Sequence, residues 1–147
     1  MGSLYSVYLH IVFSTKNRVE ILTDEIKDTV FKIFKSVAGK NEASIIECNG
    51  VSDHVHILIK VKLNTDITEI IKEMKRLSSY CINRRHQYPY FYWQHHYAAF
   101  SVSKSNCQNV ANYIRNQQIH HKDQSFHNEL EWISQKCDEP IDQDFYE

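Results

Sequence analysis

The 147-residue chain is 42% hydrophobic and 24% charged, which is typical of one folded domain. The formal net charge of −1 is unevenly distributed. Residues 138–147 carry five acidic and no basic side chains, which leaves 17 basic and 13 acidic ones in residues 1–137. We therefore expect a mildly basic domain over residues 1–137 and an acidic, mobile tail over residues 138–147.

No apolar stretch is long enough to cross a bilayer, so we expect a cytoplasmic protein without a membrane partner. The four cysteines form no C-x-x-C pair, which argues against a zinc ribbon.

The chain begins with a strand and a helix. Residues 5–14 alternate between apolar and polar side chains, as a half-buried strand does. Thr23 then precedes a stripe of apolar residues at helical spacing that runs to about Lys40. Threonine is a favourable N-cap, so we expect the helix to begin there.

Two further strands follow. Residues 43–49 and 54–61 predict the second and third strands, with the turn signal Asn49-Gly50 at the start of the connection. In the third strand, Val55 and every second residue after it face the core, whereas His54 and His56 face the opposite side.

The second half of the chain predicts three helices and a strand. Asp66 opens the second helix as part of a capping box, and residues 93–102 form the fourth strand. Another capping-box pattern at Ser105 opens a third helix through about His121, and residues 126–133 mark a short fourth helix.

This order of elements predicts an α+β fold. The sequence β-α-β-β-α-β followed by two helices matches a ferredoxin-like (RRM-like) unit. We expect an antiparallel four-stranded sheet with strands one and three in the centre and two helices on one face. The other face would then carry Tyr8, His10, His54 and His56.

The pair His54 and His56 is a candidate metal site. Residues two apart in a strand project from the same face, so both imidazoles can reach one metal ion. A bare H-x-H pattern is common, however, and two ordinary histidines on a polar strand face remain the alternative interpretation.

Tyr113 and Gln117 are the second candidate pair. They lie four residues apart on the third helix and share one of its faces, and His120 and His121 continue near that face. A helical tyrosine is usually a packing residue. The third helix is unusually polar, however, and the face that bears the histidines is not covered by the first two helices. A composite site formed by the helix and the sheet is therefore plausible.

Several segments, in order, resemble the insertion-sequence transposases with one catalytic tyrosine, the TnpA type of the HUH endonuclease superfamily. The resemblance runs from about Tyr5 to Lys136, although Val51-Ser52 replaces a Met-Pro that is frequent in the family. The segments are Thr15-Lys16-Asn17-Arg18, Asp53-His54-Val55-His56, Met74-Lys75-Arg76-Leu77-Ser78-Ser79, Trp93 with Tyr97-Ala98-Ala99-Phe100-Ser101-Val102-Ser103, Tyr113-Ile114-Arg115-Asn116-Gln117, His120-His121-Lys122 and Ser125-Phe126.

The resemblance implies a metal-dependent DNA strand transesterase. By it, His54, His56 and Gln117 bind a divalent ion, Mg²⁺ or Mn²⁺, and Tyr113 is the nucleophile that forms a 5′-phosphotyrosine. The implied substrate is single-stranded DNA with hairpins near the element ends. The implied assembly is a homodimer in which Tyr113 completes the partner's site in trans. Candidates for phosphate contact are Lys16, Arg18, Lys72, Lys75, Arg76, Arg84 and Arg85.

Two other functions stay open at this point. One is a non-catalytic nucleic-acid-binding ferredoxin-like module, for which Tyr8 is the clear aromatic candidate on the sheet face. The other is a domesticated relative that processes palindromes. A covalent DNA adduct that depends on Tyr113 distinguishes the transposase from the binding module.

Overall fold

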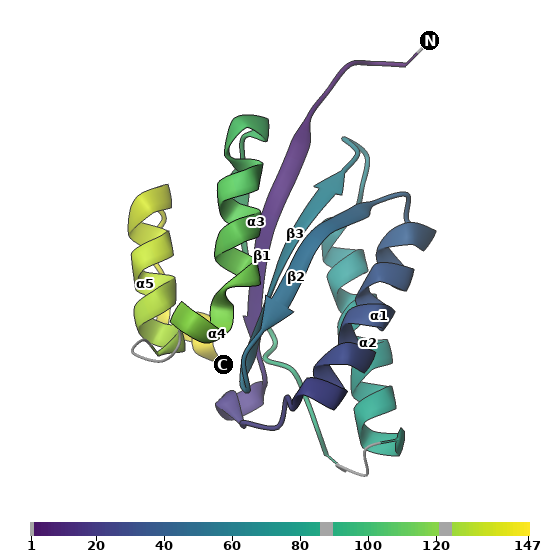
Figure 1. Ribbon diagram of the computed structural model, residues 1–147, viewed down its shortest axis with the longest axis vertical. Helices are drawn as coiled ribbons and strands as arrows, with labels where there is room; N and C mark the ends of the chain where they lie inside the picture. Colours follow the sequence, from purple (N-terminus) through teal and green to yellow (C-terminus); the bar gives the residue numbers. More distant parts are fainter. Residues whose placement is uncertain (1, 86–89, 121–124) are drawn as a thin grey trace.

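The computed structural model describes residues 2–85, 90–120 and 125–147. Its strands and helices follow one another along the chain in the predicted order, except that the predicted third helix is divided into two (Figure 1). The strands are β1 (Val7–Ser14), β2 (Ser44–Gly50), β3 (His54–Val61) and β4 (Ala98–Val102). The helices are α1 (Asp24–Lys40), α2 (Ile67–Arg85), α3 (Cys107–Arg115), α4 (Gln117–His120) and α5 (Phe126–Cys137), with short 3-10 turns η1 (Lys16–Arg18), η2 (Lys104–Asn106) and η3 (Gln143–Tyr146).

The four strands form one antiparallel sheet in the order β2-β3-β1-β4. The predicted central position of strands one and three is therefore confirmed, and so is the ferredoxin-like fold. Helices α1 and α2 lie on one face of the sheet, and α3, α4 and α5 lie on the other (Figure 1). The polar sheet face is thus covered by the later helices.

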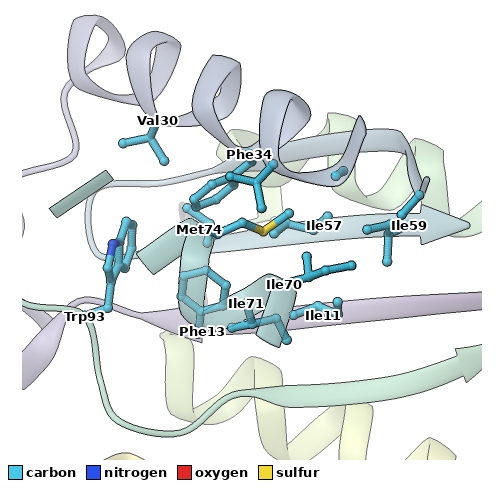
Figure 2. Packing of buried hydrophobic residues seen from close by; sticks show 14 of the residues in the cluster. Ile11, Phe13, Val30, Phe34, Ile57, Ile59, Ile70, Ile71, Met74 and Trp93 are labelled. Carbon is cyan, nitrogen blue, oxygen red and sulfur yellow. The ribbon is translucent and has the colours of Figure 1, made fainter. Parts of the chain in front are cut away.

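The main core lies between the sheet and the first two helices. Phe13 and Ile57 of the sheet pack against Phe34 of α1 and Met74 of α2, with Trp93 at one end (Figure 2). Each fully buried side chain of this size contributes about 1.5–3 kcal/mol of transfer free energy. All four residues predicted to face the core from β3 are buried: Val55, Ile57, Ile59 and Val61. This packing fixes β3 from one side, so the alternate residues project rigidly from the other.

Two of the predicted helix caps are confirmed. The Thr23 hydroxyl accepts a hydrogen bond from the backbone N–H of Ile26 at 3.3 Å, and the Asp66 carboxylate accepts one from that of Glu69 at 3.1 Å. The cap predicted at Ser105 is wrong. That residue lies inside the 3-10 turn η2, and α3 begins only at Cys107.

The second and fourth strands differ from their predicted bounds. Asn49 and Gly50, which read as the start of a turn, both belong to β2. The fourth strand begins at Ala98, whereas it was predicted from residue 93, and Trp93 forms only a single bridge with Thr15. The reason lies in Lys75, whose ammonium group draws backbone carbonyls of residues 94–96 towards α2.

The predicted third helix is interrupted at Asn116. Helix α3 ends at Arg115, and α4 begins at Gln117. The side chain of Asn49 donates hydrogen bonds to the carbonyls of Ile114 and Arg115, each at 3.0 Å. These bonds satisfy carbonyls that would otherwise continue the helix. The local sequence pattern of the helix contains no information on this contact with β2, so it could not predict the interruption.

The acidic tail contacts the domain. The carbonyl of Phe145 accepts a hydrogen bond of 2.6 Å from Gln94, and the ring of Tyr146 stacks on His127 with centroids 3.9 Å apart. The mobility expected for the tail stays a prediction. In the described part of the chain, no helix combines the length and apolar character that a membrane span needs.

Candidate functional site

The site is built at the start of β3, on the polar face of the strand. His54 and His56 project together from this face, and neither is exposed to solvent. The Nε2 atoms of both imidazoles lie 3.0 Å from Oε1 of Glu129, which comes from α5. The predicted juxtaposition of the two histidines on one strand face is thus present, together with a carboxylate that the sequence analysis did not single out.

Each histidine has a second partner at Nδ1. His54 Nδ1 lies 2.8 Å from a carboxylate oxygen of Asp53, and His56 Nδ1 lies 2.8 Å from Nε2 of His10. Such outer partners fix the orientation of metal-binding imidazoles. Burial opposes protonation of His54, but its hydrogen bonds with Asp53 and Glu129 outweigh burial and raise its pKa. Burial, reinforced by His56, lowers the pKa of His10 to about 3, so His10 is neutral at physiological pH.

Tyr113 reaches the histidines from α3. Its hydroxyl donates a hydrogen bond to Oε2 of Glu129, and its ring stands edge-on to His56 with centroids 6.0 Å apart. Trp132 of α5 stacks on the other side of the ring at 5.9 Å. Burial, and then the negative charge of Glu129, raise the pKa of Tyr113 above its usual value. The phenol is therefore protonated in this arrangement.

Gln117 completes the group that sequence reasoning singled out. It is buried, and its Nε2 donates a hydrogen bond of 2.9 Å to Oε2 of Glu129. Its Oε1 is buried and has no hydrogen-bond partner among the described residues. An amide oxygen with unused lone pairs beside two imidazoles is suited to accept a metal ion. The break at Asn116 does not separate Gln117 from Tyr113, since both contact the same carboxylate.

Glu129 is the residue that sequence reasoning missed. It is fully buried and contacts His54, His56, Tyr113 and Gln117. A signal for it was present: Glu129 lies three residues after Phe126 and directly before Leu130, within the apolar stripe of the predicted fourth helix. A carboxylate at the buried position of an amphipathic helix requires a compensating partner.

The donor set suits a divalent cation. One ligand atom each from His54, His56 and Glu129 lie within 4.8 Å of one another, and all three residues are buried. Carboxylate and amide oxygens are ligands that Mg²⁺ and Mn²⁺ prefer, and the two imidazole nitrogens favour Mn²⁺ over Mg²⁺. Of the other nearby histidines named in the sequence analysis, His121 lies outside the described residues.

The candidates for DNA contact do not converge on this site. Lys16, Lys72, Lys75 and Arg76 instead line a hollow of about 490 Å³ beside α2, here called the α2 hollow, together with Tyr92. Lys75 points inwards and donates to the carbonyls of Gln94 and His96 at 2.8 and 2.9 Å. The other three are exposed, although Arg76 is paired with Glu73.

The remaining three candidates lie elsewhere. Arg18 contacts the ring of His127, and it lines a different hollow beside the start of α1. Arg84 lies over the exposed ring of Tyr80 at 5.1 Å, and Arg85 is exposed at the end of α2.

Comparison with known proteins places the fold and site in context. A family model described as IS200-like transposase matches residues 3–117. The ISDra2 transposase TnpA of Deinococcus radiodurans is 25% identical over 126 residues, which cover 79% of this chain and 87% of that protein.

Two solved structures share the fold. A crystal structure described as a transposase from Deinococcus radiodurans R1 superposes with a TM-score of 0.61 at 24% identity, covering 80% of this chain and 95% of that one. A REP-associated tyrosine transposase bound to a REP hairpin superposes with a TM-score of 0.63 at 13% identity, covering 82% and 73%. Together with the family match over most of its length, these findings show that the chain belongs to the IS200-like transposase family.

Proposed function

We propose that this transposase cuts and rejoins single-stranded DNA at the ends of its element through a 5′-phosphotyrosine at Tyr113. The observation that carries the proposal is the convergence of the Tyr113 hydroxyl, the His54 and His56 imidazoles and the Gln117 amide around Glu129. A lone packing tyrosine has no need of this polar environment.

His54, His56 and Gln117 would hold a divalent cation. The donor atoms would be the two Nε2 atoms and the buried Oε1 of Gln117, which has no hydrogen-bond partner among the described residues. A cation held there serves as a Lewis acid towards a bound phosphodiester. His10 and Asp53 hold the two imidazole rings in place from behind.

Tyr113 supplies the nucleophile. Its phenol oxygen forms a bond to phosphorus as the bond between phosphorus and the 3′ oxygen breaks. The phenol proton is lost, and the departing 3′ oxygen gains a proton. Phenol, with a pKa of about 10, is a better leaving group than a sugar hydroxyl, so the 3′-OH of another strand can displace it. The second step restores Tyr113 and needs no external energy source.

The phenol hydrogen bond has a consequence for the first step. Tyr113 donates to Glu129 in the described arrangement, and burial keeps the phenol protonated. The proton, which points at Glu129, must therefore leave the hydroxyl as a lone pair of its oxygen attacks phosphorus. Trp132 stacks on the ring and limits how far it can rotate.

Covalent capture of DNA tests the proposal. Single strands from the DNA that flanks the gene, labelled at the 5′ side and 3′ side in separate reactions, are incubated with protein and Mn²⁺ and then run on a denaturing gel. We expect an adduct that carries only the label on the 3′ side of the cut, since Tyr113 retains the 5′-phosphate. Tyr113→Phe should abolish it, whereas Tyr80→Phe, a change at an exposed tyrosine on α2, should not. Binding without any adduct would support the non-catalytic module.

The metal requirement has its own test. Excess EDTA should abolish the adduct, and added Mn²⁺ or Mg²⁺ should restore it. Full adduct yield in EDTA would overturn the metal-dependent mechanism. His56→Ala should abolish the adduct with the fold retained, as judged by circular dichroism.

Hairpin DNA is the proposed partner. The REP-associated neighbour was solved with a REP hairpin bound, which supports structured single strands as the substrate class. A hairpin near the element end should therefore compete for binding better than an unstructured strand of equal length. The same neighbour also supports the alternative of a domesticated relative that processes palindromes. Inverted repeats scattered through the genome, away from the gene, would favour that alternative.

We also propose a homodimer that shares its sites in trans. Within one chain, Tyr113 lies beside its own histidines, so the described geometry is that of a cis site. Two subunits that exchanged their helices after Ser103 would build the same site in trans. A mixed dimer of one His56→Ala and one Tyr113→Phe subunit then contains one intact site. That site combines the intact His56 of the Tyr113→Phe subunit with the intact Tyr113 of the His56→Ala subunit. Mixed dimers that form but never yield an adduct would exclude the trans arrangement.

A further inference from the structure

Glu129 lies at the centre of the site but outside the part of the chain that matches the family. The family match ends at residue 117, whereas α5 begins at Phe126. We propose that Glu129 is a further protein ligand of the divalent cation, so that two imidazoles, an amide and a carboxylate hold the ion. This inference rests on the proposed function, because it concerns the ion of the same site.

The position of the carboxylate supports this role. Oε1 of Glu129 lies 3.0 Å from Nε2 of both His54 and His56. In an octahedral site with bonds of about 2.1 Å, neighbouring ligand atoms lie about 3 Å apart. One oxygen therefore stands next to both imidazoles at the separation that adjacent positions around one ion require.

Electrostatics supports the same role. Glu129 is fully buried, and a carboxylate is costly to bury unless a positive charge compensates it. A divalent cation between the imidazoles and the carboxylate supplies this charge. In return, the carboxylate lowers the net charge of the site from +2 to +1 and adds the oxygen ligand that hard cations prefer.

Residues of α5 before and after Glu129 fix the position of its carboxylate. The Ser125 hydroxyl caps the helix by accepting from the N–H of Asn128 at 3.2 Å. Phe126 packs against the ring of His54 with centroids 4.7 Å apart, and Leu130 packs with Val12 of β1. Because the residues on either side of Glu129 are anchored to the sheet, the carboxylate is fixed relative to the histidines. Docking of α5 is then part of metal binding.

The test measures Mn²⁺ binding directly, apart from activity. Isothermal titration of Mn²⁺ compares the wild type with Glu129→Gln, which keeps the shape and removes the charge. Glu131→Gln, at an exposed glutamate two residues along α5, is the matched control. We expect Glu129→Gln to weaken binding at least about tenfold, because loss of even an outer partner of a metal ligand costs about 10- to 100-fold. Glu131→Gln should bind as the wild type does.

A second variant and a second measurement keep the inference testable if Glu129→Gln does not fold. Glu129→Asp retains the charge but withdraws the oxygens, so its affinity should lie between those of the wild type and Glu129→Gln. Saturating Mn²⁺ should also raise the Tm of the wild type and raise that of Glu129→Asp less. Affinity and Tm shift equal to the wild type in the Glu129 variants would overturn the inference.

The outcomes separate this inference from the proposed function. If His56→Ala loses Mn²⁺ binding while Glu129→Gln binds normally, the inference fails and the proposed metal site stands. If the wild type and His56→Ala bind Mn²⁺ alike, the proposed site itself fails, and the role of Glu129 as a ligand fails with it. The adduct of Tyr113 is measured independently of both.

Discussion

The Nε2 atom of His10 lies 2.8 Å from Nδ1 of His56, with both imidazoles buried. The two rings stack with centroids 5.1 Å apart, across the contact between β1 and β3. The low pKa of His10, about 3, keeps it neutral, because burial and His56 disfavour its charged form. A neutral His10 can accept a hydrogen bond at Nε2 from His56 Nδ1–H. That tautomer leaves Nε2 of His56 with the lone pair that a metal ion requires.

His10 should therefore set the metal affinity of the site without touching the ion. We expect His10→Leu to weaken Mn²⁺ binding about 10- to 100-fold, as loss of an outer partner of a metal ligand does. His10→Gln keeps an oxygen that can accept from Nδ1–H and should restore much of the affinity. Titration of Mn²⁺ measures both.

An exposed histidine offers the control for this prediction. His96→Leu removes an imidazole from the surface and should leave Mn²⁺ binding unchanged. If His10→Leu and His10→Gln weaken binding equally, the effect comes from packing and not from the hydrogen bond to His56.

The fold could be predicted from the sequence because its signals are local. Alternation along residues 54–61 and the caps at Thr23 and Asp66 specify strand and helices without reference to the rest of the chain. The errors arose where a distant side chain acts on the backbone. Asn49 ends α3 through carbonyls 65 and 66 residues away, and Lys75 delays the start of β4. Such contacts leave no trace in the local pattern.

The candidate site was predicted in part for a similar reason. His54, His56, Tyr113 and Gln117 fall in motifs that the resemblance could identify, and the structure brings them together. Glu129 lies outside any motif, and only its place in an apolar stripe distinguishes it from a surface glutamate. That α5 docks against β3 is a consequence of tertiary packing, which a helical pattern does not encode.

Lys75 should contribute a distinctive pH dependence to stability. Burial lowers its pKa from 10.5 to about 8 in the folded protein. Between these values the unfolded chain binds more protons than the native one, so the contribution of Lys75 to the free energy of unfolding rises with pH. Wild-type stability should therefore increase relative to Lys75→Met as the pH rises from about 8 to 10.5. Urea denaturation in EDTA at several pH values measures the difference.

A neighbouring lysine is the control for this comparison. Lys72 is exposed on the same helix, so Lys72→Met should differ from the wild type by an amount that does not change over this range. A constant difference for Lys75→Met as well would mean that its ammonium group carries no burial penalty.

The α2 hollow gives a prediction about DNA affinity. The exposed Nζ of Lys16 lies 6.0 Å from the centre of the Tyr92 ring, a combination that suits a phosphate with its neighbouring base. If DNA binds here, Lys16→Ala should weaken binding of all sequences alike. It should also reduce the slope of log K against the logarithm of salt concentration by about 1. Fluorescence anisotropy at several salt concentrations measures this. Lys35→Ala, at an exposed residue of α1 outside the hollow, is the comparison. Equal slopes for both variants would show that DNA does not contact the hollow.

Gly50 controls how closely β2 approaches the start of β3. A Cβ atom at this position would lie 2.5 Å from the carbonyl oxygen of His54 and 3.1 Å from the Cα of Val55. Both are backbone atoms of β3, so Gly50→Ala must push the strands apart where His54 begins. We expect a loss of about 1–3 kcal/mol in the free energy of unfolding and weaker Mn²⁺ binding.

Gly39→Ala is the opposite case on the same chain. A Cβ there meets no atom within 4 Å, and the residue lies inside α1. Because alanine restricts the unfolded chain and favours the helix, this change should stabilise the protein by about 0.4–1 kcal/mol and leave Mn²⁺ binding unchanged. Urea denaturation without metal gives both free energies. If Gly50→Ala proves as harmless as Gly39→Ala, β3 can shift without cost, and the close contact between these strands does not hold His54 in place.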